Sequence, residues 1–220
     1  MIRRPPRSTQ GVSSAASDVY KRQAGECSIN RDQLEEYDFV IGVDSGAEYL
    51  YKLFLIPNLI IGDLDSINIK TLERAEKDKA EILSYERNKD KTDFELSLNY
   101  LKEKEYKDIT IIGGESGDID HLFGNLLSLS HFHTNESIEW KQSNQNIIFP
   151  NSESIDVETN KIFSLIPLSK LEKVSITGAK WNIENENIDF GSSRTLRNVT
   201  HGTELKIKVE SGSYCLVFNN

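Results

Sequence analysis

The chain has 220 residues, of which 37% are hydrophobic and 9% aromatic, and its formal net charge is −9. This composition excludes wholesale disorder, and the length suits one large domain or two small ones. A negative surface repels phosphates, so neither nucleic acid nor an anionic membrane is expected as a partner. Cys27 and Cys215 stand far apart, which excludes a disulfide framework, and no apolar run approaches the roughly 20 residues that span a bilayer. We therefore expect a cytoplasmic protein.

Residues 1–23 differ from the rest of the chain. They hold five Lys or Arg, one Asp and a Ser/Ala stretch, with no periodic apolar face. A transit peptide forms an amphipathic helix, which Pro5-Pro6 opposes, and the apolar core of a secretory signal is absent. We interpret 1–23 as a lead that is non-native or disordered, similar to sequence translated from an adaptor. The alternative is a flexible basic arm.

From residue 24 to 133, short apolar strands alternate with helical stretches. The spacing predicts strands over 39–43, 59–61, 81–85 and 109–112, and helices over 47–55, 69–79, about 93–101 and from residue 120. Thr92 and Glu95 match a capping box at the start of the third of these helices. This alternation predicts an α/β domain over 24–133, with a parallel sheet and helices on both faces.

After about residue 132 the pattern changes to short alternating segments separated by turns. Strands are expected over 138–140, 147–149, 162–166, 173–177, 205–209 and 214–218. The pattern predicts a second domain over 134–220, an all-β sandwich or small barrel.

Carboxylates follow the predicted strands of the first domain. They are Asp44, Asp63, Asp65, Asp90, Asp93 and, after a glycine-rich loop, Asp120. In an open parallel sheet, ligands bind outside the carboxyl ends of the strands. Clustered carboxylates repel one another unless a cation intervenes, and Mg²⁺ prefers oxygen ligands. The sequence therefore predicts a magnesium site at this edge.

Four of these acids also have an ordinary interpretation. Asp63 and Asp65 project to the same side of extended chain and can reach one ion, yet a lone D-x-D is more often an Asp-rich turn. Asp93 and Asp120 could complement helix dipoles, an effect below about 1 kcal/mol each at exposed sites. Their shared edge favours function.

Phosphate-binding features lie in the same half of the chain. The loop from Gly113 to Gly117 can present backbone N–H groups to a phosphate, although it is neither a Walker A loop nor a dinucleotide fingerprint. Lys89 and Lys91 could neutralise a triphosphate, or they could form solvated pairs with nearby Asp. His121 could donate to a phosphate or a substrate, and an ordinary surface or core histidine is the equal alternative.

Seven segments, taken together and in chain order, resemble the thiamine pyrophosphokinase family. In the first half they are Asp44–Ala47 (family pattern D-G-G-A), Gly62–Ser66 (G-D-F-D-S), Lys89–Asp93 (K-D-x-T-D) and Gly113–His121 with Asn125 (G-A-T-G-G-R-x-D-H…N). In the second half they are Phe163–Leu168 (S-L-I-P-L), Gly178–Asn185 (G-x-K-Y-x-L-x-N) and Gly191–Asn198 (G-x-S-x-x-x-S-N). No single motif decides the matter, whereas the ordered set is specific and covers the chain from about Ala24.

The resemblance implies a Rossmann-like α/β domain and a thiamine-binding β domain. It implies transfer of the pyrophosphoryl group of ATP to the hydroxyl of thiamine, giving thiamine diphosphate and AMP, by a Mg²⁺-dependent homodimer with thiamine held between subunits. The implied catalytic residues are Asp63, Asp65, Asp93 and Asp120, the first three of them as metal ligands. The implied nucleotide-binding residues are Asp44, Lys89, Gly113, Gly117 and Asn125, and the implied substrate-binding residues are His121, Ser193 and Asn198.

Three departures from the family pattern accompany this resemblance. Asp118 stands where the family has Arg, Arg197 stands where it has Ser, and the lead occupies the place of the family's first strand, so the sheet is expected to lose that member if the lead replaces it. Two other functions stay open. One is a pyrophosphokinase for another heteroaromatic alcohol, such as a hydroxymethylpterin. The other is a non-catalytic thiamine- or nucleotide-binding protein.

Overall fold

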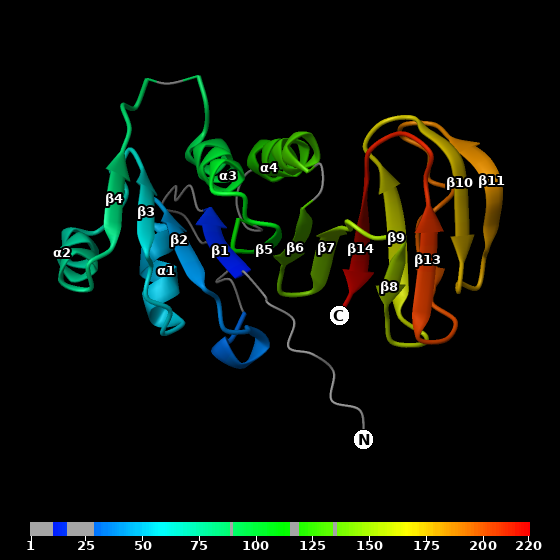
Figure 1. The fold of residues 1–220 in the computed structure, drawn as a ribbon, viewed down its shortest axis with the longest axis horizontal. Coiled ribbons are helices and arrows are strands. Elements are labelled where there is room, and N and C mark those ends of the chain that lie inside the picture. The colour runs from blue at the N-terminus through cyan, green and yellow to red at the C-terminus, as the bar shows by residue number, and fades with distance from the viewer. Residues whose placement is uncertain (1–10, 17–28, 89, 115–118, 134–135) are drawn as a thin grey trace. The chain divides into compact units, whose positions relative to one another are not determined.

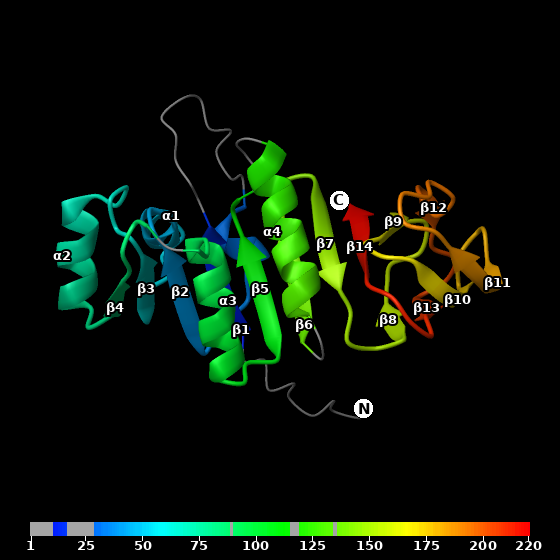
Figure 2. The ribbon, with the colours of Figure 1, turned by 90° about the horizontal axis from the view of Figure 1, so that it is seen from above.

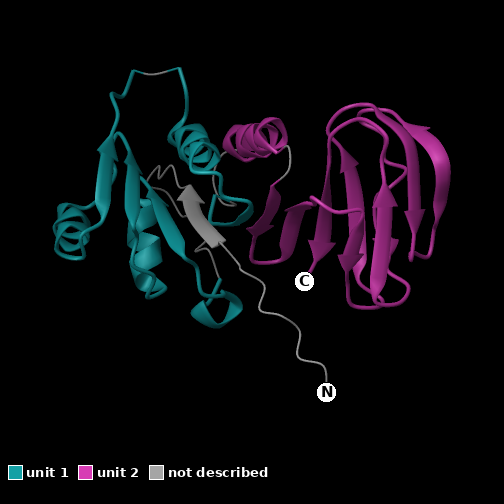
Figure 3. Ribbon diagram, in the orientation of Figure 1, with its two compact units in different colours: residues 1–24, 29–114 teal, residues 25–28, 115–220 magenta. Residues whose placement is uncertain are grey.

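The computed structural model describes residues 11–16, 29–88, 90–114, 119–133 and 136–220. The chain divides into two compact units, shown in Figure 3. Unit 1 contains residues 1–24 and 29–114, and unit 2 contains residues 25–28 and 115–220. Each unit is described by itself.

Unit 1 is built on a parallel sheet with the strand order β5-β1-β2-β3-β4 (Figures 1 and 2). Its strands are β1 (Gly11–Ala16), β2 (Phe39–Val43), β3 (Leu59–Gly62), β4 (Glu81–Ser84) and β5 (Asp108–Ile112). β2 and β3 are buried along almost their whole length, as their unbroken apolar sequences require. The predicted parallel α/β sheet is confirmed.

The helices of unit 1 lie on both faces of this sheet. They are α1 (Gly46–Lys52), α2 (Ile69–Lys77) and α3 (Asp93–Glu103), preceded by a short 3-10 turn, η1 (Arg31–Gln33). Ala47 of α1, Ile60 of β3 and Ala75 of α2 share one core cluster, so α1 and α2 cover the same face. The chain then crosses back from β4 to β5, and the right-handed connection rule places α3 on the opposite face, as Figure 1 shows.

Helix α3 begins as its sequence predicts. Thr92 is the N-cap, its hydroxyl accepts a hydrogen bond from the Glu95 N–H at 3.1 Å, and the Glu95 carboxylate accepts one from the Thr92 N–H at 2.9 Å. This capping box sets Asp93 as the first helical residue, directly after the connection from β4.

The lead of residues 1–23 contributes a strand. β1 pairs in parallel with β2 on one side and with β5 on the other, with Ser14 opposite both Ile41 and Ile111. The expected loss of the family's first strand is therefore wrong, because residues 11–16 fill that place. Whether 1–23 is native stays a prediction, and the rest of the lead lies outside the described residues.

Unit 2 contains helix α4 and two antiparallel sheets. α4 spans Ile119–Phe132. One sheet has the order β12-β9-β14-β7-β6, from β6 (Ser137–Lys141), β7 (Gln145–Phe149), β9 (Ile162–Pro167), β12 (Asn198–Val199) and β14 (Tyr214–Asn219). The other has the order β11-β10-β13-β8, from β8 (Ser154–Asp156), β10 (Leu171–Thr177), β11 (Ile183–Ile188) and β13 (Glu204–Lys208).

The two sheets of unit 2 enclose one hydrophobic core. Fully buried side chains from the first sheet, such as Phe163 and Leu216, join Val174, Ile176 and Leu205 of the second in a single cluster. The strands alternate buried and exposed positions, for example along β9 and β13. The predicted β-sandwich is thus confirmed for this part of the chain.

Three strands of unit 2 were not predicted from the sequence, and the predicted domain boundary differs from the division between the units. β8, β11 and β12 are short or polar, and the sequence of β11, Ile-Glu-Asn-Glu-Asn-Ile, is poor in strand-forming residues. The compact units divide at 114/115 and assign α4 to unit 2, whereas the sequence division of 24–133 and 134–220 counts it with the α/β domain; that boundary stays a prediction. Among the described residues, no helix is long and apolar enough to cross a membrane.

Strand β1 offers a test of stability. Central strands of parallel sheets are typically continuous apolar runs, whereas β1 reads Gly-Val-Ser-Ser-Ala-Ala. Replacing Ser13 and Ser14 by Val should raise the free energy of unfolding by about 1 kcal/mol, and Tm by about 2–4 °C, in a thermal scan. Thr203→Val, at an exposed turn, is the control with little expected effect. An unchanged Tm in the double variant would contradict this role of β1.

Candidate active site

Asp44 stands at the centre of the carboxylate cluster in unit 1. It directly follows β2, and its backbone N–H donates to the Ile61 carbonyl at 3.0 Å, which ties the ends of β2 and β3 together. Its side-chain Oδ1 accepts a hydrogen bond from the Leu64 N–H at 3.2 Å. The Asp44 carboxylate is thus held across the turn that carries Asp63 and Asp65.

The backbone around this carboxylate is strained. Asp44 and Leu64 both adopt left-handed conformations, with φ of 46° and 61°, and for a bulky residue such as leucine this is unfavourable. Gly62 has φ of 154°, and a Cβ there would lie 1.8 Å from Asp44 Oδ1. Only glycine therefore lets the end of β3 approach the Asp44 carboxylate this closely.

Asp93 brings a second carboxyl group to Asp44. The two side chains lie close enough for the Asp93 carboxylate to act on that of Asp44, and Oδ1 of Asp93 is buried. Burial, the Asp93 charge and the charge of Asp63 together raise the pKa of Asp44 to about 7, against the favourable hydrogen bond from Leu64. Three sequence-predicted residues, Asp44, Asp63 and Asp93, are therefore close enough to interact electrostatically.

Asp65 takes a different position at the edge of the cluster. Its N–H donates to Asp63 Oδ1 at 3.1 Å, while its own Oδ2 forms an ion pair with Arg87 Nη1 at 3.4 Å. Its side chain is about half exposed, and that of Arg87 is more than three-quarters exposed. Asp63 and Asp65 are thus linked through the turn, and a guanidinium already neutralises one of them.

The segment from Lys89 to Lys91 is described only in part. Asp90 and Lys91 are exposed, and Lys89 lies outside the described residues. Within the described ranges, no three Asp, Glu, His or Cys side chains are gathered tightly enough to enclose a metal ion by themselves. The cluster is therefore a carboxyl pair with further acids at its margin.

The glycine-rich loop begins directly after β5. Gly113 and Gly114 both have positive φ, of 79° and 68°, which glycine adopts without strain. Gly117, which is expected to bind the nucleotide, lies outside the described residues. So does Asp118, which stands where the family pattern has Arg.

Helix α4, which belongs to unit 2, contains three of the predicted site residues. Asp120 lies in its first turn, exposed, and its Oδ1 accepts a hydrogen bond from the His121 N–H at 2.9 Å. His121 is exposed and Asn125 is partly buried. Their position relative to the carboxylates of unit 1 stays a prediction.

Asn198 of the β domain is engaged in local structure. It is buried, its Oδ1 accepts from the N–H groups of Trp181 and Val199, and its Nδ2 donates to the Trp181 carbonyl at 2.8 Å. Trp181 itself is 54% exposed, with the Lys180 ammonium 4.5 Å from its ring centre. Asn198 therefore fixes the backbone of an exposed aromatic residue. Ser193 lies exposed in the preceding loop.

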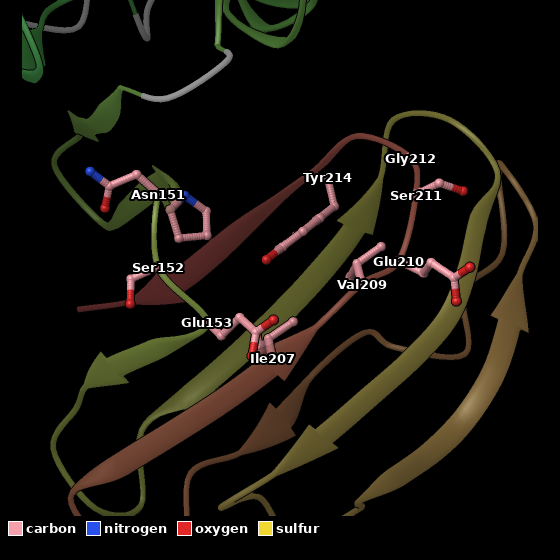
Figure 4. Close-up of a pocket in the computed structure, with 10 residues that line it drawn as sticks. Asn151, Ser152, Glu153, Ile207, Val209, Glu210, Ser211, Gly212 and Tyr214 are labelled. Carbon is pink, nitrogen blue, oxygen red and sulfur yellow. The ribbon is translucent and has the colours of Figure 1, made fainter.

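A groove of about 310 Å³ in unit 2 contains none of the predicted residues (Figure 4). Tyr214 lies in it with its hydroxyl directed towards Ser152 and Glu153, and burial, with the Glu153 charge, raises the pKa of Tyr214 to about 12. The groove is lined by Pro150, Asn151, Ser152, Glu153, Ile207, Val209, Glu210, Ser211, Gly212 and Tyr214.

Two residues that contact predicted site residues, Arg87 and Trp181, were not predicted from the sequence. Arg87 contacts Asp65 from a different loop, and no local pattern in the sequence signals such a pair. Trp181 was part of a quoted motif but was not singled out, although a tryptophan beside a turn in a polar stretch is the available signal.

Unit 1 is thus a parallel α/β sheet with carboxyl groups gathered at its strand ends, and unit 2 is a β-sandwich. Residues 31–141 match the family model of the thiamin pyrophosphokinase catalytic domain, and residues 145–214 match that of the thiamin pyrophosphokinase vitamin B1 binding domain.

Individual proteins that are similar to this chain belong to the same family as the two family models. A thiamine pyrophosphokinase of Bacillus subtilis is 33% identical over 169 residues, covering 74% of this chain and 79% of the relative. Thiamin pyrophosphokinase 1 of Caenorhabditis elegans is 27% identical, covering 70% and 67%. The crystal structure of the Bacillus subtilis thiamine pyrophosphokinase has a TM-score of 0.79 and 24% identity, covers 96% and 99% of the two chains, and supports the fold.

The chain belongs to the thiamine pyrophosphokinase family. It is an ATP-dependent kinase with a thiamine-binding domain.

The raised pKa of Asp44 predicts how the metal-free protein responds to pH. Between the unfolded pKa near 4 and the folded value of about 7, the folded state holds the proton more tightly, so stability is lost as the pH rises. After allowance for solvent screening, Tm in chelator should fall by about 2–6 °C between about pH 5 and pH 8. Asp44→Asn should remove this loss, whereas Asp38→Asn, at an exposed position, should keep it. Equal pH slopes for Asp44→Asn and the unchanged protein would contradict the carboxyl pair.

Replacing Asn198 tests its local role. Asn198→Ala leaves buried backbone groups near Trp181 without their partner, so the free energy of unfolding should fall by about 1–3 kcal/mol in urea denaturation. The exposed Glu184→Ala is the control, with a change within about 0.5 kcal/mol. Loss of thiamine binding in Asn198→Ala with unchanged stability would instead indicate a direct contact with thiamine.

Proposed function

We propose that Asp44, Asp63, Asp65 and Asp93 form a Mg²⁺-dependent site that positions ATP for pyrophosphoryl transfer to the hydroxyl of thiamine. Asp63, Asp65 and Asp93 are the proposed metal ligands, and Asp44 supports them from the end of β2. The observation that carries the proposal is the gathering of acids at one place: Asp44 lies within electrostatic reach of Asp93 and Asp63, and its carboxylate is bonded to the turn that carries Asp63 and Asp65.

The donor set fits a magnesium ion. Mg²⁺ keeps several water molecules and needs only one or two carboxylates when substrate phosphates complete its shell. A cluster that repels itself without a cation, and that offers only carboxylate oxygens, suits such a hard ion better than a softer metal. When bound, the ion neutralises charge on the phosphates that the protein must bring beside these acids.

In the proposed reaction, the thiamine hydroxyl oxygen forms a bond to the β-phosphorus of ATP. The bond from this phosphorus to the oxygen shared with the α-phosphate breaks, and AMP leaves with that oxygen. The hydroxyl proton passes to a base, a role that we assign to Asp120, with His121 beside it. Phosphoryl transfer depends mainly on positioning and charge neutralisation, which is what residues on rigid strand ends and helix starts provide.

The β domain supplies the proposed thiamine contacts. Trp181 offers an exposed ring face that can stack on the pyrimidine, and Asn198 acts by holding its backbone. Ser193 is exposed in the neighbouring loop, where its hydroxyl can bond to the substrate. The acidic balance of the chain suits the cationic thiazolium ring.

Further residues are proposed to bind the nucleotide, and the protein is proposed to form a homodimer. Lys89, Gly113, Gly117 and Asn125 are the proposed phosphate-side residues, in keeping with a glycine-rich turn whose backbone N–H groups can bind an anion. We further propose that the protein is a homodimer, with thiamine held between subunits, and that it acts in the cytoplasm, where ATP is available.

The central test is Asp63→Asn. The substitution keeps the size of the side chain but removes a charge, so formation of AMP from ATP and thiamine should fall by about 10²–10³-fold, as when one preorganised electrostatic partner is lost. Circular dichroism and Tm verify the fold, and Asp38→Asn is the matched control with activity retained. The assay measures thiamine diphosphate together with AMP, and a hydroxymethylpterin substrate is run in parallel. Retention of most activity by Asp63→Asn would remove the metal-site proposal.

A further inference from the structure

The segment between β4 and α3 carries a cation to the carboxylate cluster. Arg87 lies three residues after the end of β4, and its Nη1 is 3.4 Å from Oδ2 of Asp65. Asp65 in turn is linked by its N–H to Asp63 Oδ1. The Arg87 guanidinium therefore neutralises an acid that belongs to the D-x-D turn itself.

This ion pair is loosely held. The Arg87 side chain is 81% exposed and the Asp65 side chain 48% exposed. Solvent-exposed pairs of this kind contribute little to stability, typically about 0–1 kcal/mol, so the guanidinium can leave Asp65 at small cost. The Arg87 guanidinium can thus exchange Asp65 for another anionic partner.

A bound triphosphate requires more cations than the glycine-rich loop offers. Residues 113–121, Gly-Gly-Glu-Ser-Gly-Asp-Ile-Asp-His, contain no Lys or Arg and three acids. A guanidinium is also better suited than an ammonium to two phosphate oxygens, because its fork of donors forms parallel hydrogen bonds. Arg87, which pairs with an acid of the proposed site, can supply the positive charge that this loop lacks.

The segment that carries Arg87 borders an open hollow. Tyr85 and Lys91, on either side of Arg87 in the chain, line a groove of about 320 Å³ together with residues of α3, among them Asn99 and Tyr100. The connection from β4 to α3 thus has free space beside it, at residues on either side of Arg87 in the chain.

We propose that Arg87 is an exchangeable counter-ion, which pairs with Asp65 when the site lacks metal and moves to the phosphates of ATP when Asp65 turns to the ion. This inference rests on the proposed Mg²⁺–ATP site and extends it to a residue outside the family motifs quoted above. In the metal-free protein Arg87 competes with Mg²⁺ for Asp65. In the complex it binds the anion that accompanies the metal.

The exchange predicts effects of opposite sign in Arg87→Gln. Loss of the competing charge should strengthen binding of Mg²⁺ alone by about two- to five-fold at low salt, the size of an exposed ion pair. Loss of a charge-assisted contact should weaken binding of Mg²⁺ with α,β-methylene-ATP by about five- to thirty-fold. Isothermal titration calorimetry on the full chain measures both dissociation constants, and α,β-methylene-ATP is chosen because its α–β bridge cannot be cleaved.

Two variants control the measurement. Arg87→Lys keeps the charge but not the fork, so it should restore the Mg²⁺ affinity and only part of the nucleotide affinity. Arg74→Gln removes the same charge from an exposed ion pair on α2, with Asp78, and should leave both constants unchanged.

The opposite shifts in Arg87→Gln support the exchange, and any other pattern overturns it, including two unchanged constants or two weakened ones. Wild-type formation of AMP and thiamine diphosphate is measured in the same series. If the wild type makes both products while Arg87→Gln lacks the opposite shifts, only the role of Arg87 fails. If the wild type makes neither product, the proposed function itself fails.

Discussion

Repulsion between carboxyl groups at the ends of neighbouring strands is the constraint on which unit 1 depends. An acid follows β2, another follows β3, and a third begins α3, and these three lie close enough to interact. The backbone adopts unfavourable left-handed conformations at Asp44 and Leu64 beside them. Hydrophobic burial of β2 and β3 beneath the cluster offsets this cost. The proposed magnesium ion, arriving with the phosphates of ATP, would relieve this repulsion.

The features predicted from the sequence are those that depend on neighbours along the chain. Unbroken apolar runs marked β2 and β3, and the Thr92–Glu95 pattern marked the start of α3 to the residue. The acids after these strands could then be assigned to one edge, because parallel strands end on the same side. Local pattern and strand direction therefore sufficed to bring Asp44, Asp63 and Asp93 together.

Features that depend on contacts distant in sequence could not be predicted in this way. The pairing of Arg87 with Asp65 crosses from one connection to another, and the hydrogen bonds of Asn198 reach back 17 residues to Trp181. β1 and β11 were missed because their sequences, rich in small or polar residues, resemble loops and acquire strand structure only through their neighbours in the sheet.

The contact between Gly62 and Asp44 has a consequence for how this sequence can change. With φ of 154° and a carboxylate oxygen where a Cβ would stand, position 62 accepts a side chain only if Asp44 moves. Every amino-acid replacement there would displace the acid at the centre of the cluster, even one as small as alanine. Variation at this codon is therefore tied to the position of Asp44, whereas exposed neighbours in the same turn, such as Ser66, can vary without moving the cluster.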